Sequence, residues 1–158
     1  ADWGHLAANM AGCVIFATAV CAWIGSGVGV LLILAAGVAG NWVTAVVYQS
    51  GHTAIGASTA VFGALGLIAA NQFIEKIRVP GQRMRAWLPI AGALALLGFL
   101  GVSERSDLLA HFFGLLAGLV MGAIANLTLP RPPGASVQNA CLVLVFTIVA
   151  AAWFTGFG

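Results

Sequence analysis

The sequence carries very little charge. Of 158 residues only 6% are Asp, Glu, Lys or Arg, four acids against six bases, while 61% are hydrophobic. A soluble domain carries about 25% charged residues, so this chain has too little polar surface to cover a globule in water. The scarcity excludes a free cytosolic enzyme, a disordered tail and a nucleic-acid binder, because six scattered bases form no stripe along a phosphate backbone. The chain is predicted to be an integral membrane protein.

Cysteine is also scarce. Cys13, Cys21 and Cys141 each lie inside an apolar run, and an odd number of cysteines within hydrocarbon forms no disulfide framework. We interpret them as small hydrophobic side chains. No signal peptide is visible, and the chain opens with Ala1 rather than Met, which we interpret as the start of a fragment.

Long apolar runs make up most of the chain. A helix needs about 20 apolar residues to cross a hydrocarbon layer of roughly 30 Å, and cutting the chain at charges, prolines and Gly/Ser clusters leaves six segments. Lipid accepts only helices or closed barrels, and no series of short alternating strands is present. The predicted fold class is therefore all-α, a polytopic transmembrane bundle of six helices, whose third and fourth members are short for a full crossing. The segments are 5–24, 28–48, 58–74, 87–102, 108–129 and 137–157.

The bases predict the orientation of these segments. Five of the six fall in the connections 75–86 and 130–136, which lie on the same side of the membrane if the segments alternate, and only Arg105 lies opposite. The positive-inside rule makes the side with five bases cytoplasmic. The first, third and fifth segments then enter from the outside, and we expect a bacterial inner (plasma) membrane. The five bases are Lys76, Arg78, Arg83, Arg85 and Arg131.

Four chemically active side chains share one depth. His5 and Asn9 stand in the first turns of the first segment, Ser58 opens the third, and His111 follows the start of the fifth by three residues. At a rise of about 1.5 Å per residue, all four lie within roughly 10 Å of the outer ends of their helices. Ionisable groups inside membrane spans are costly and indicate a functional site.

Each of these residues has an ordinary structural explanation when it is taken singly. Ser58 can cap a helix N-terminus, and His111 can form a hydrogen bond with another helix. His5 and Asn9, spaced i and i+4, share one helix face and can anchor a helix end.

Their joint occurrence favours serine chemistry. A serine that attacks a carbonyl needs a base within hydrogen-bond reach and donors aimed at the developing oxyanion. Ser58 is the candidate nucleophile and His111 the candidate base. The candidate oxyanion donors are the His5 ring, the Asn9 amide and the backbone N–H of Ser58. A helix that starts at Ser58 also supplies free N–H groups and a positive dipole end.

Small residues accompany both candidates. Ser58 lies in GASTAVFG, residues 56–63, and His111 lies in AHFFGLLAG, residues 110–118, which Gly122 follows. Small residues at every fourth position let two membrane helices approach closely, so the glycine face is expected to place His111 against the third segment. Generic helix packing also explains such a repeat when it is taken alone.

These motifs resemble those of the rhomboid family of intramembrane serine proteases. GASTAVFG fits the family's GxSxxxFG nucleophile motif, AHFFGLLAG fits its AHxxGxxxG histidine motif, and HLAAN fits its HxxxN oxyanion motif. They occur in the family's order on three alternate segments, and the resemblance covers residues 4–129. It implies an intramembrane serine endopeptidase with Ser58 as nucleophile, His111 as general base and no acid as a third member.

The resemblance also implies the surroundings of this dyad. Phe62 would pack against the catalytic imidazole, with Gly56 and Gly114 as supporting residues of the motifs, and His5 and Asn9 would donate to the oxyanion. The substrate would be a transmembrane protein in the same lipid bilayer, cleaved in or near its transmembrane segment. No cofactor, metal ion or nucleic acid is expected, and the sequence does not predict an oligomeric state.

Two features depart from the family pattern. Family members place a first transmembrane helix and a membrane-embedded loop ahead of the HxxxN helix, while segment 137–157 resembles the extra helix of the seven-helix branch. We therefore expect residues 1–129 to be a rhomboid-like catalytic core lacking the first family helix, and residues 130–158 to be a linker and an extra C-terminal transmembrane helix. Asp107 is interpreted as a helix N-cap rather than a triad acid, and His52 as loop structure or a substrate contact.

Two other functions fit the sequence less well. A non-proteolytic rhomboid-like binding or trafficking factor is the main alternative, but such a protein should lack Ser58 or His111, and this chain has both. A transporter or channel would show broken helices around a site at the membrane midplane, whereas the polar residues here lie near one face.

Overall fold

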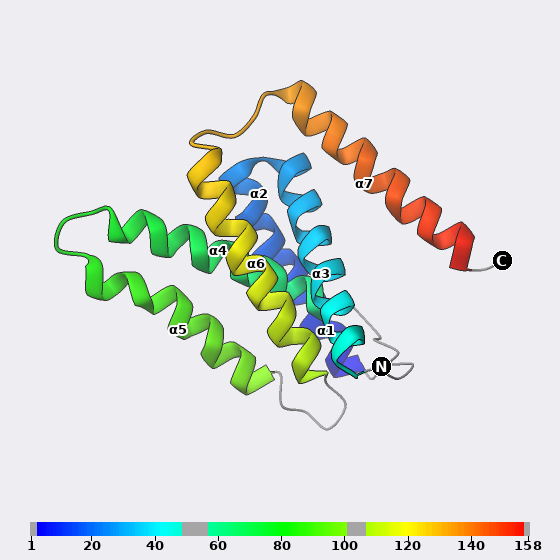
Figure 1. The fold of residues 1–158 in the computed structure, drawn as a ribbon, viewed down its shortest axis with the longest axis horizontal. Coiled ribbons are helices and arrows are strands. Elements are labelled where there is room, and N and C mark those ends of the chain that lie inside the picture. Colours follow the sequence, from blue (N-terminus) through cyan, green and yellow to red (C-terminus); the bar gives the residue numbers. More distant parts are fainter. Residues whose placement is uncertain (1–2, 49–56, 101–106, 157–158) are drawn as a thin grey trace.

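The chain folds into a bundle of helices. The computed structural model describes residues 3–48, 57–100 and 107–156 (Figure 1), and every regular element in these ranges is a helix. The first helical segment is continuous and joins α1, the π-helical turn η1 and α2, so the described residues form six helical segments, and the predicted all-α fold class is confirmed. The elements are α1 (Trp3–Gly12), η1 (Cys13–Ala17), α2 (Thr18–Ile24), α3 (Ser26–Tyr48), α4 (Ser58–Ile77), α5 (Arg83–Leu100), α6 (Leu108–Thr128) and α7 (Ala135–Gly156).

Several helix bounds differ from the predicted ones. Gly25 alone separates α2 from α3, because its φ of 93° is a conformation that glycine adopts at little cost. The α3 helix therefore begins at Ser26 rather than at residue 28. The α4 helix has 20 residues and ends at Ile77, so the prediction that this segment is short for a crossing is wrong. Because α5 already begins at Arg83, the predicted connection 75–86 shrinks to residues 78–82.

Five helical segments among the described residues are long and apolar enough to cross a membrane. The α5 helix does not meet this condition; it has 18 residues, two arginines at its start and Pro89 inside. Its short length agrees with the expectation for the fourth segment. The five candidate spans are Leu6–Ile24, Ser26–Tyr48, Ser58–Ile77, Leu108–Thr128 and Ala135–Gly156.

The α4 and α6 helices touch backbone to backbone. A Cβ atom at Gly118 would fall on the carbonyl oxygen of Gly63, and one at Gly66 would fall on the carbonyl oxygen of Leu115. Such close approach is what small residues permit between membrane helices. The expected packing of the glycine face of α6 against the third segment is confirmed.

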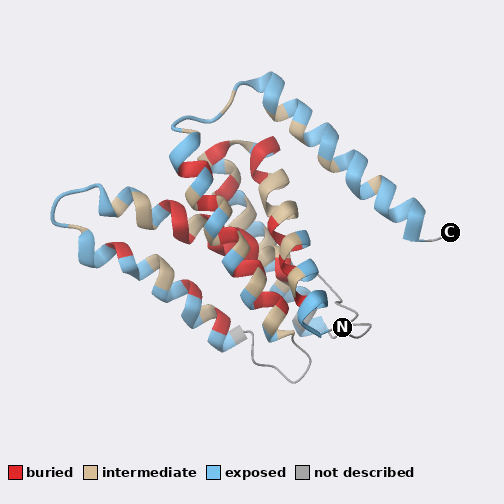
Figure 2. Ribbon diagram, in the orientation of Figure 1, coloured by how far each residue is buried: buried red, intermediate tan, exposed pale blue. Residues whose placement is uncertain are grey.

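The α3 helix joins this pair through its own glycines. A Cβ atom at Gly40 would lie 2.7 Å from the backbone nitrogen of Gly114, and one at Gly37 would lie 2.9 Å from the Cβ of Ala60. Figure 2 shows the buried residues concentrated on α4, on α6 and on the part of α3 that faces them. These three helices are the core on which the other elements pack.

Larger apolar side chains fill the spaces on either side of this core. One cluster joins α2 and α3 to α4 and α6, and the other joins α5 to α4 and α6. The rings of Phe73 and Trp87 add an edge-to-face contact between α4 and α5, with centroids 5.0 Å apart. The buried members are Val20, Ile24, Val28, Ala64, Leu67 and Ala125 in the first cluster, and Phe62, Leu65, Ala69, Ala93, Leu97 and Leu115 in the second.

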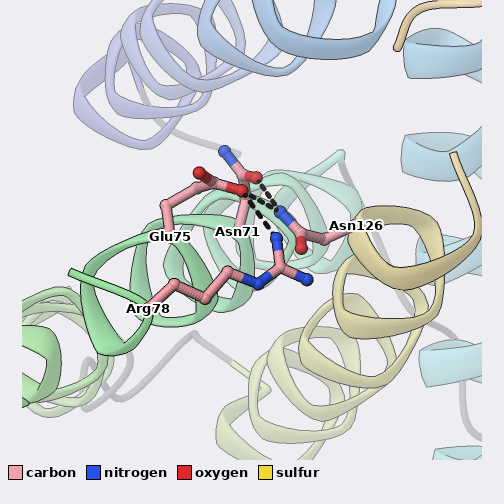
Figure 3. Close-up of polar contacts among 4 residues, drawn as sticks. All are labelled: Asn71, Glu75, Arg78 and Asn126. Atoms are coloured by element: carbon pink, nitrogen blue, oxygen red, sulfur yellow. Dashed lines mark hydrogen bonds and ion pairs between the residues drawn. The ribbon is translucent and has the colours of Figure 1, made fainter. Parts of the chain in front are cut away.

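A polar contact joins α4 and α6 near their C-terminal ends. The Asn126 Nδ2 atom donates to Asn71 Oδ1 at 2.7 Å and to Glu75 Oε1 at 2.9 Å (Figure 3), and both asparagines are buried. Arg78 lies on the outer side of the cluster and pairs with Glu75 at 3.2 Å. An amide buried without a partner is costly, so the contact opposes separation of the two helices.

The α7 helix docks near its N-terminal end, where Cys141 packs against the first cluster and Gln138 forms hydrogen bonds. Gln138 accepts a hydrogen bond from the Val28 N–H at 3.0 Å and donates one to the Ile24 carbonyl at 2.9 Å. It thereby satisfies groups that the end of α2 and the start of α3 leave without helical partners. Beyond this point α7 diverges from the bundle (Figure 1), and none of its described residues is buried (Figure 2).

The glycine contacts predict opposite effects for the same substitution at two sites. Gly118→Ala should destabilise the bundle by about 1–3 kcal/mol because the new methyl group overlaps the backbone of α4. Gly92→Ala on α5 should leave stability unchanged or raise it by up to about 1 kcal/mol, since no atom lies within 4 Å of a Cβ there and alanine favours the helix. Thermal unfolding of both variants in one detergent measures the difference. An unchanged Tm for Gly118→Ala would contradict the close contact.

Candidate active site

A cavity of about 100 Å³ lies among α1, η1, α4, α5 and α6. Three of its lining residues are polar: Asn9 from α1, Ser58 from α4 and His111 from α6. Ser58 and His111 stand near the N-terminal ends of their helices, and Asn9 stands in the second turn of α1. The structure therefore brings together three of the four polar side chains that the sequence placed at one depth. The remaining lining residues are Ala8, Gly12, Phe16, Val61, Phe62, Leu65 and Leu96.

Ser58 is the first residue of α4. The N-cap is Ala57, which forms no side-chain cap hydrogen bond, so Ser58 stands inside the first turn rather than at the cap position. The first helical backbone hydrogen bond of the element runs from the Val61 N–H to the Ala57 carbonyl at 3.0 Å. The N–H groups before Val61 have no acceptor within the helix and lie at its positive end. They are suited to stabilise an anion beside Ser58.

His111 is held in a fixed plane against α4. Its side chain is 3% exposed, and its ring stacks on Phe62 with centroids 4.6 Å apart and an angle of 29° between the planes. Three residues later, a Cβ atom at Gly114 would fall on the carbonyl oxygen of Thr59. The absence of a side chain at Gly114 thus lets α6 approach α4 directly beside Ser58.

Asn9 reaches the cavity from a third helix. Its side chain is half-buried, and one turn later Gly12 lies so close to α4 that a Cβ atom would stand 2.6 Å from Val61 Cγ1. His5 belongs to α1 one turn before Asn9, but its side chain lies outside the described part of the structure. Gly56 and His52 also lie outside the described residues.

Asp107 caps α6. Its carboxylate accepts a hydrogen bond from the Ala110 N–H at 3.0 Å, which confirms the N-cap interpretation. The positive end of the helix dipole also stabilises a carboxylate at this position. Asp107 is not among the residues that line the cavity.

Sequence reasoning missed several apolar residues of the cavity wall. Gly12 and Phe16 follow Asn9 by three and seven residues, a spacing that puts them on the same helix face and that could have identified them. Leu96 comes from α5, and no pattern in the sequence links this residue to the motifs. The wall matters because apolar surroundings strengthen every electrostatic interaction inside the cavity.

The arrangement can support acyl transfer to a hydroxyl group. It combines a serine, a buried imidazole, an amide and helix N–H groups around a space large enough for a few water molecules. Among the described residues, no group of three or more His, Cys, Asp or Glu side chains could hold a metal ion.

Comparison with known proteins identifies the family. A family model described as the Rhomboid domain matches residues 1–127, a range that includes every residue of the cavity wall. Searches among curated proteins and among solved structures returned no match. Together with the five apolar spans, the family match establishes a multi-pass integral membrane protein. The chain belongs to the rhomboid family, whose members are generally intramembrane proteases.

Proposed function

We propose that this chain is an intramembrane serine endopeptidase that uses Ser58 and His111 as a catalytic dyad. The observation that carries the proposal is the cavity in which a helix-terminal serine, a stacked imidazole and an amide from three different helices line one space. The family match supports the class of activity. The substrate is another protein's transmembrane segment, unwound locally because an intact helix hides its carbonyl groups in hydrogen bonds.

Acylation begins with attack by Ser58 Oγ on the scissile carbonyl carbon. The His111 imidazole accepts the hydroxyl proton as the new C–O bond forms, and the carbonyl oxygen becomes an oxyanion. His5, Asn9 and the Ser58 N–H donate to this oxygen. When the C–N bond breaks, the imidazolium returns its proton to the leaving amine, and the acyl group stays on Ser58 as an ester.

Deacylation repeats the sequence with water. A water molecule in the cavity gives a proton to His111 while its oxygen attacks the ester carbon. Collapse of the second oxyanion breaks the bond to Ser58 Oγ, which recovers the proton from His111. The products are a new carboxyl terminus and the regenerated serine. Proton transfer through the imidazole contributes about 10²–10⁴-fold, and the oxyanion donors contribute about 10²–10³-fold each.

The orientation and domain division follow from the same proposal. The cavity opens among the N-terminal ends of α4 and α6, opposite the connection 78–82 and its flanking bases, so the site faces the outside of a bacterial inner membrane. Residues 1–129 form the catalytic core, and residues 130–158 form a linker and an additional helix. The end of the family match at residue 127 and the exposure of α7, in which no described residue is buried, support this division.

Replacement of the nucleophile should abolish activity without loss of the fold. Ser58→Ala should give neither cleavage of a transmembrane substrate nor labelling by a fluorophosphonate probe, because the attacking oxygen is gone while the change in volume is small. Ser136→Ala, the same substitution at an exposed position of α7, should behave as the parent. Cleavage by Ser58→Ala at the parent rate would refute the proposal.

Replacement of the base should remove both activities. His111→Ala should lose cleavage and fluorophosphonate labelling, since Ser58 then has no proton acceptor. In the parent, activity should rise with pH, because only the neutral imidazole accepts a proton. Labelling that persists in His111→Ala would identify another base, with His52 as the next candidate.

Loss of one oxyanion donor should slow turnover more than it weakens binding. Asn9→Ala should lower kcat by about 10²–10³-fold with a smaller change in KM, because the interaction matures in the transition state. His5→Ala should behave similarly, and the pair can be non-additive. If both single variants and the double variant turn over at the parent rate, HLAAN is a packing motif only.

A further inference from the structure

The helix that carries Asn9 is interrupted by a π turn. Residues Cys13–Ala17 form η1 between α1 and α2, and π-helical bonding accommodates one more residue than an α-helical turn does. The turn divides the segment into two parts with different surroundings. Before it, Asn9 and Gly12 face the cavity and α4; after it, Val20 and Ile24 are 0% and 1% exposed and belong to the core cluster.

An uninterrupted α-helix could not place both parts toward the bundle. Each α-helical residue advances by about 100° around the axis. On that geometry, the face formed by Ala8, Asn9 and Gly12 would point about 90° away from the face formed by Val20 and Ile24. One extra residue taken up in the turn removes about 100° of this rotation. The two faces then coincide, as the structure shows.

The contact with α4 depends on this phase. Gly12 meets Val61 so closely that a Cβ atom would lie 2.6 Å from its Cγ1. With Val20 and Ile24 held in the core, a regular helix would present Cys13 to Val61 in place of Gly12, and Leu6 and Met10 would turn toward the cavity in place of Asn9.

We propose that the π turn Cys13–Ala17 is a positioning element that sets the rotation of α1, so that Asn9 faces the cavity and Gly12 faces α4. The turn acts through Asn9, and Phe16 within the turn lines the cavity. Its consequence for turnover rests on the proposed function. The rotation of α1 is a structural statement that can be tested separately.

Disulfide formation between α1 and α4 reports the rotation without any measurement of activity. The Cβ position of Gly12 lies 3.8 Å from the Cβ of Val61, close to the mean separation in disulfides of about 3.8 Å. In a background with Cys13, Cys21 and Cys141 replaced by Ala, the pair Gly12→Cys with Val61→Cys should cross-link on mild oxidation. Native Cys13 retained with Val61→Cys should not.

Insertion of one alanine after Val14 should exchange the two results, because the turn takes up one extra residue and a second one rotates α1 by about 100° relative to α2. Val14 is 68% exposed, so an insertion beside it takes little packing from the core. In the lengthened chain the cross-link through Gly12→Cys should disappear and the cross-link through Cys13 should appear, a gain that an unfolded protein does not produce. Deletion of Val14 should instead keep the cross-link through Gly12→Cys, because a regular α-helix with one residue fewer brings the two faces into the same phase. Val14→Ala, which leaves the residue count unchanged, should cross-link as the parent does.

Turnover provides the second measurement. The insertion after Val14 should lower kcat by at least the factor of about 10²–10³ expected for Asn9→Ala, and adding Asn9→Ala to it should cause no further loss, because Asn9 no longer faces the cavity. A further loss of similar size would show that the turn does not act through Asn9.

Two cross-linking results overturn the proposal. One is pairing through Cys13 rather than Gly12→Cys in the chain without the insertion, which needs no insertion variant at all. The other is persistence of the Gly12→Cys cross-link after the insertion. Neither depends on proteolysis, so a parent that lacks Ser58-dependent cleavage would refute the proposed function and leave the rotation of α1 to be decided by the disulfides.

Discussion

The backbone contact between α4 and α6 is the constraint on which the site depends. Lipid gives apolar helices no hydrophobic reason to associate, so close dispersion contacts and polar contacts must hold them together. Where the carbonyl oxygen of Gly63 occupies the place of a side chain at Gly118, any added atom forces the two helices apart. Because Ser58 and His111 stand on these two helices, that movement separates the proposed nucleophile from the proposed base. Displacements of about 1 Å already cost a catalytic site about 10²-fold in rate.

Glycine packing alone leaves the register of the two helices weakly determined. Gly114, Gly118 and Gly122 recur at every fourth residue, so a slip by one turn would bring one glycine to the place of the next. The amide of Asn126 has no such repeat. A four-residue slip would move it about 6 Å from Asn71 and leave buried polar groups unsatisfied at about 1–3 kcal/mol each. The polar contact at one end of the pair therefore selects the register that brings the serine and the histidine together at the other end.

The sequence was sufficient for the fold class and for the polar side of the cavity because both depend on local signals. Apolar run length predicts helices, and the three motifs lie at equal depth whatever the exact packing. The break at Gly25 was predicted from the Gly/Ser cluster there. The bonds of Gln138 were not predictable, since they join residues 110 or more positions apart and a glutamine near a helix start looks like an ordinary surface residue. The π turn gave no signal either, because Cys13–Ala17 is as apolar as its neighbours and its geometry depends on what the two flanking faces must contact.

The candidate site therefore combines residues from two separate parts of the bundle. The proposed nucleophile and base come from the tightly packed α4 and α6, and so does the Ser58 N–H. The proposed side-chain donors to the oxyanion come from α1, which meets α4 through Gly12 at the start of a π turn. An α-helix fixes the direction of every later side chain once its first residues are placed, so only an irregular turn lets the two halves of this segment be oriented independently. The orientation of Asn9 can consequently change while Ser58 and His111 keep their places on α4 and α6. In the proposed mechanism, the rotation of α1 therefore affects stabilisation of the transition state and not the pairing of Ser58 with His111.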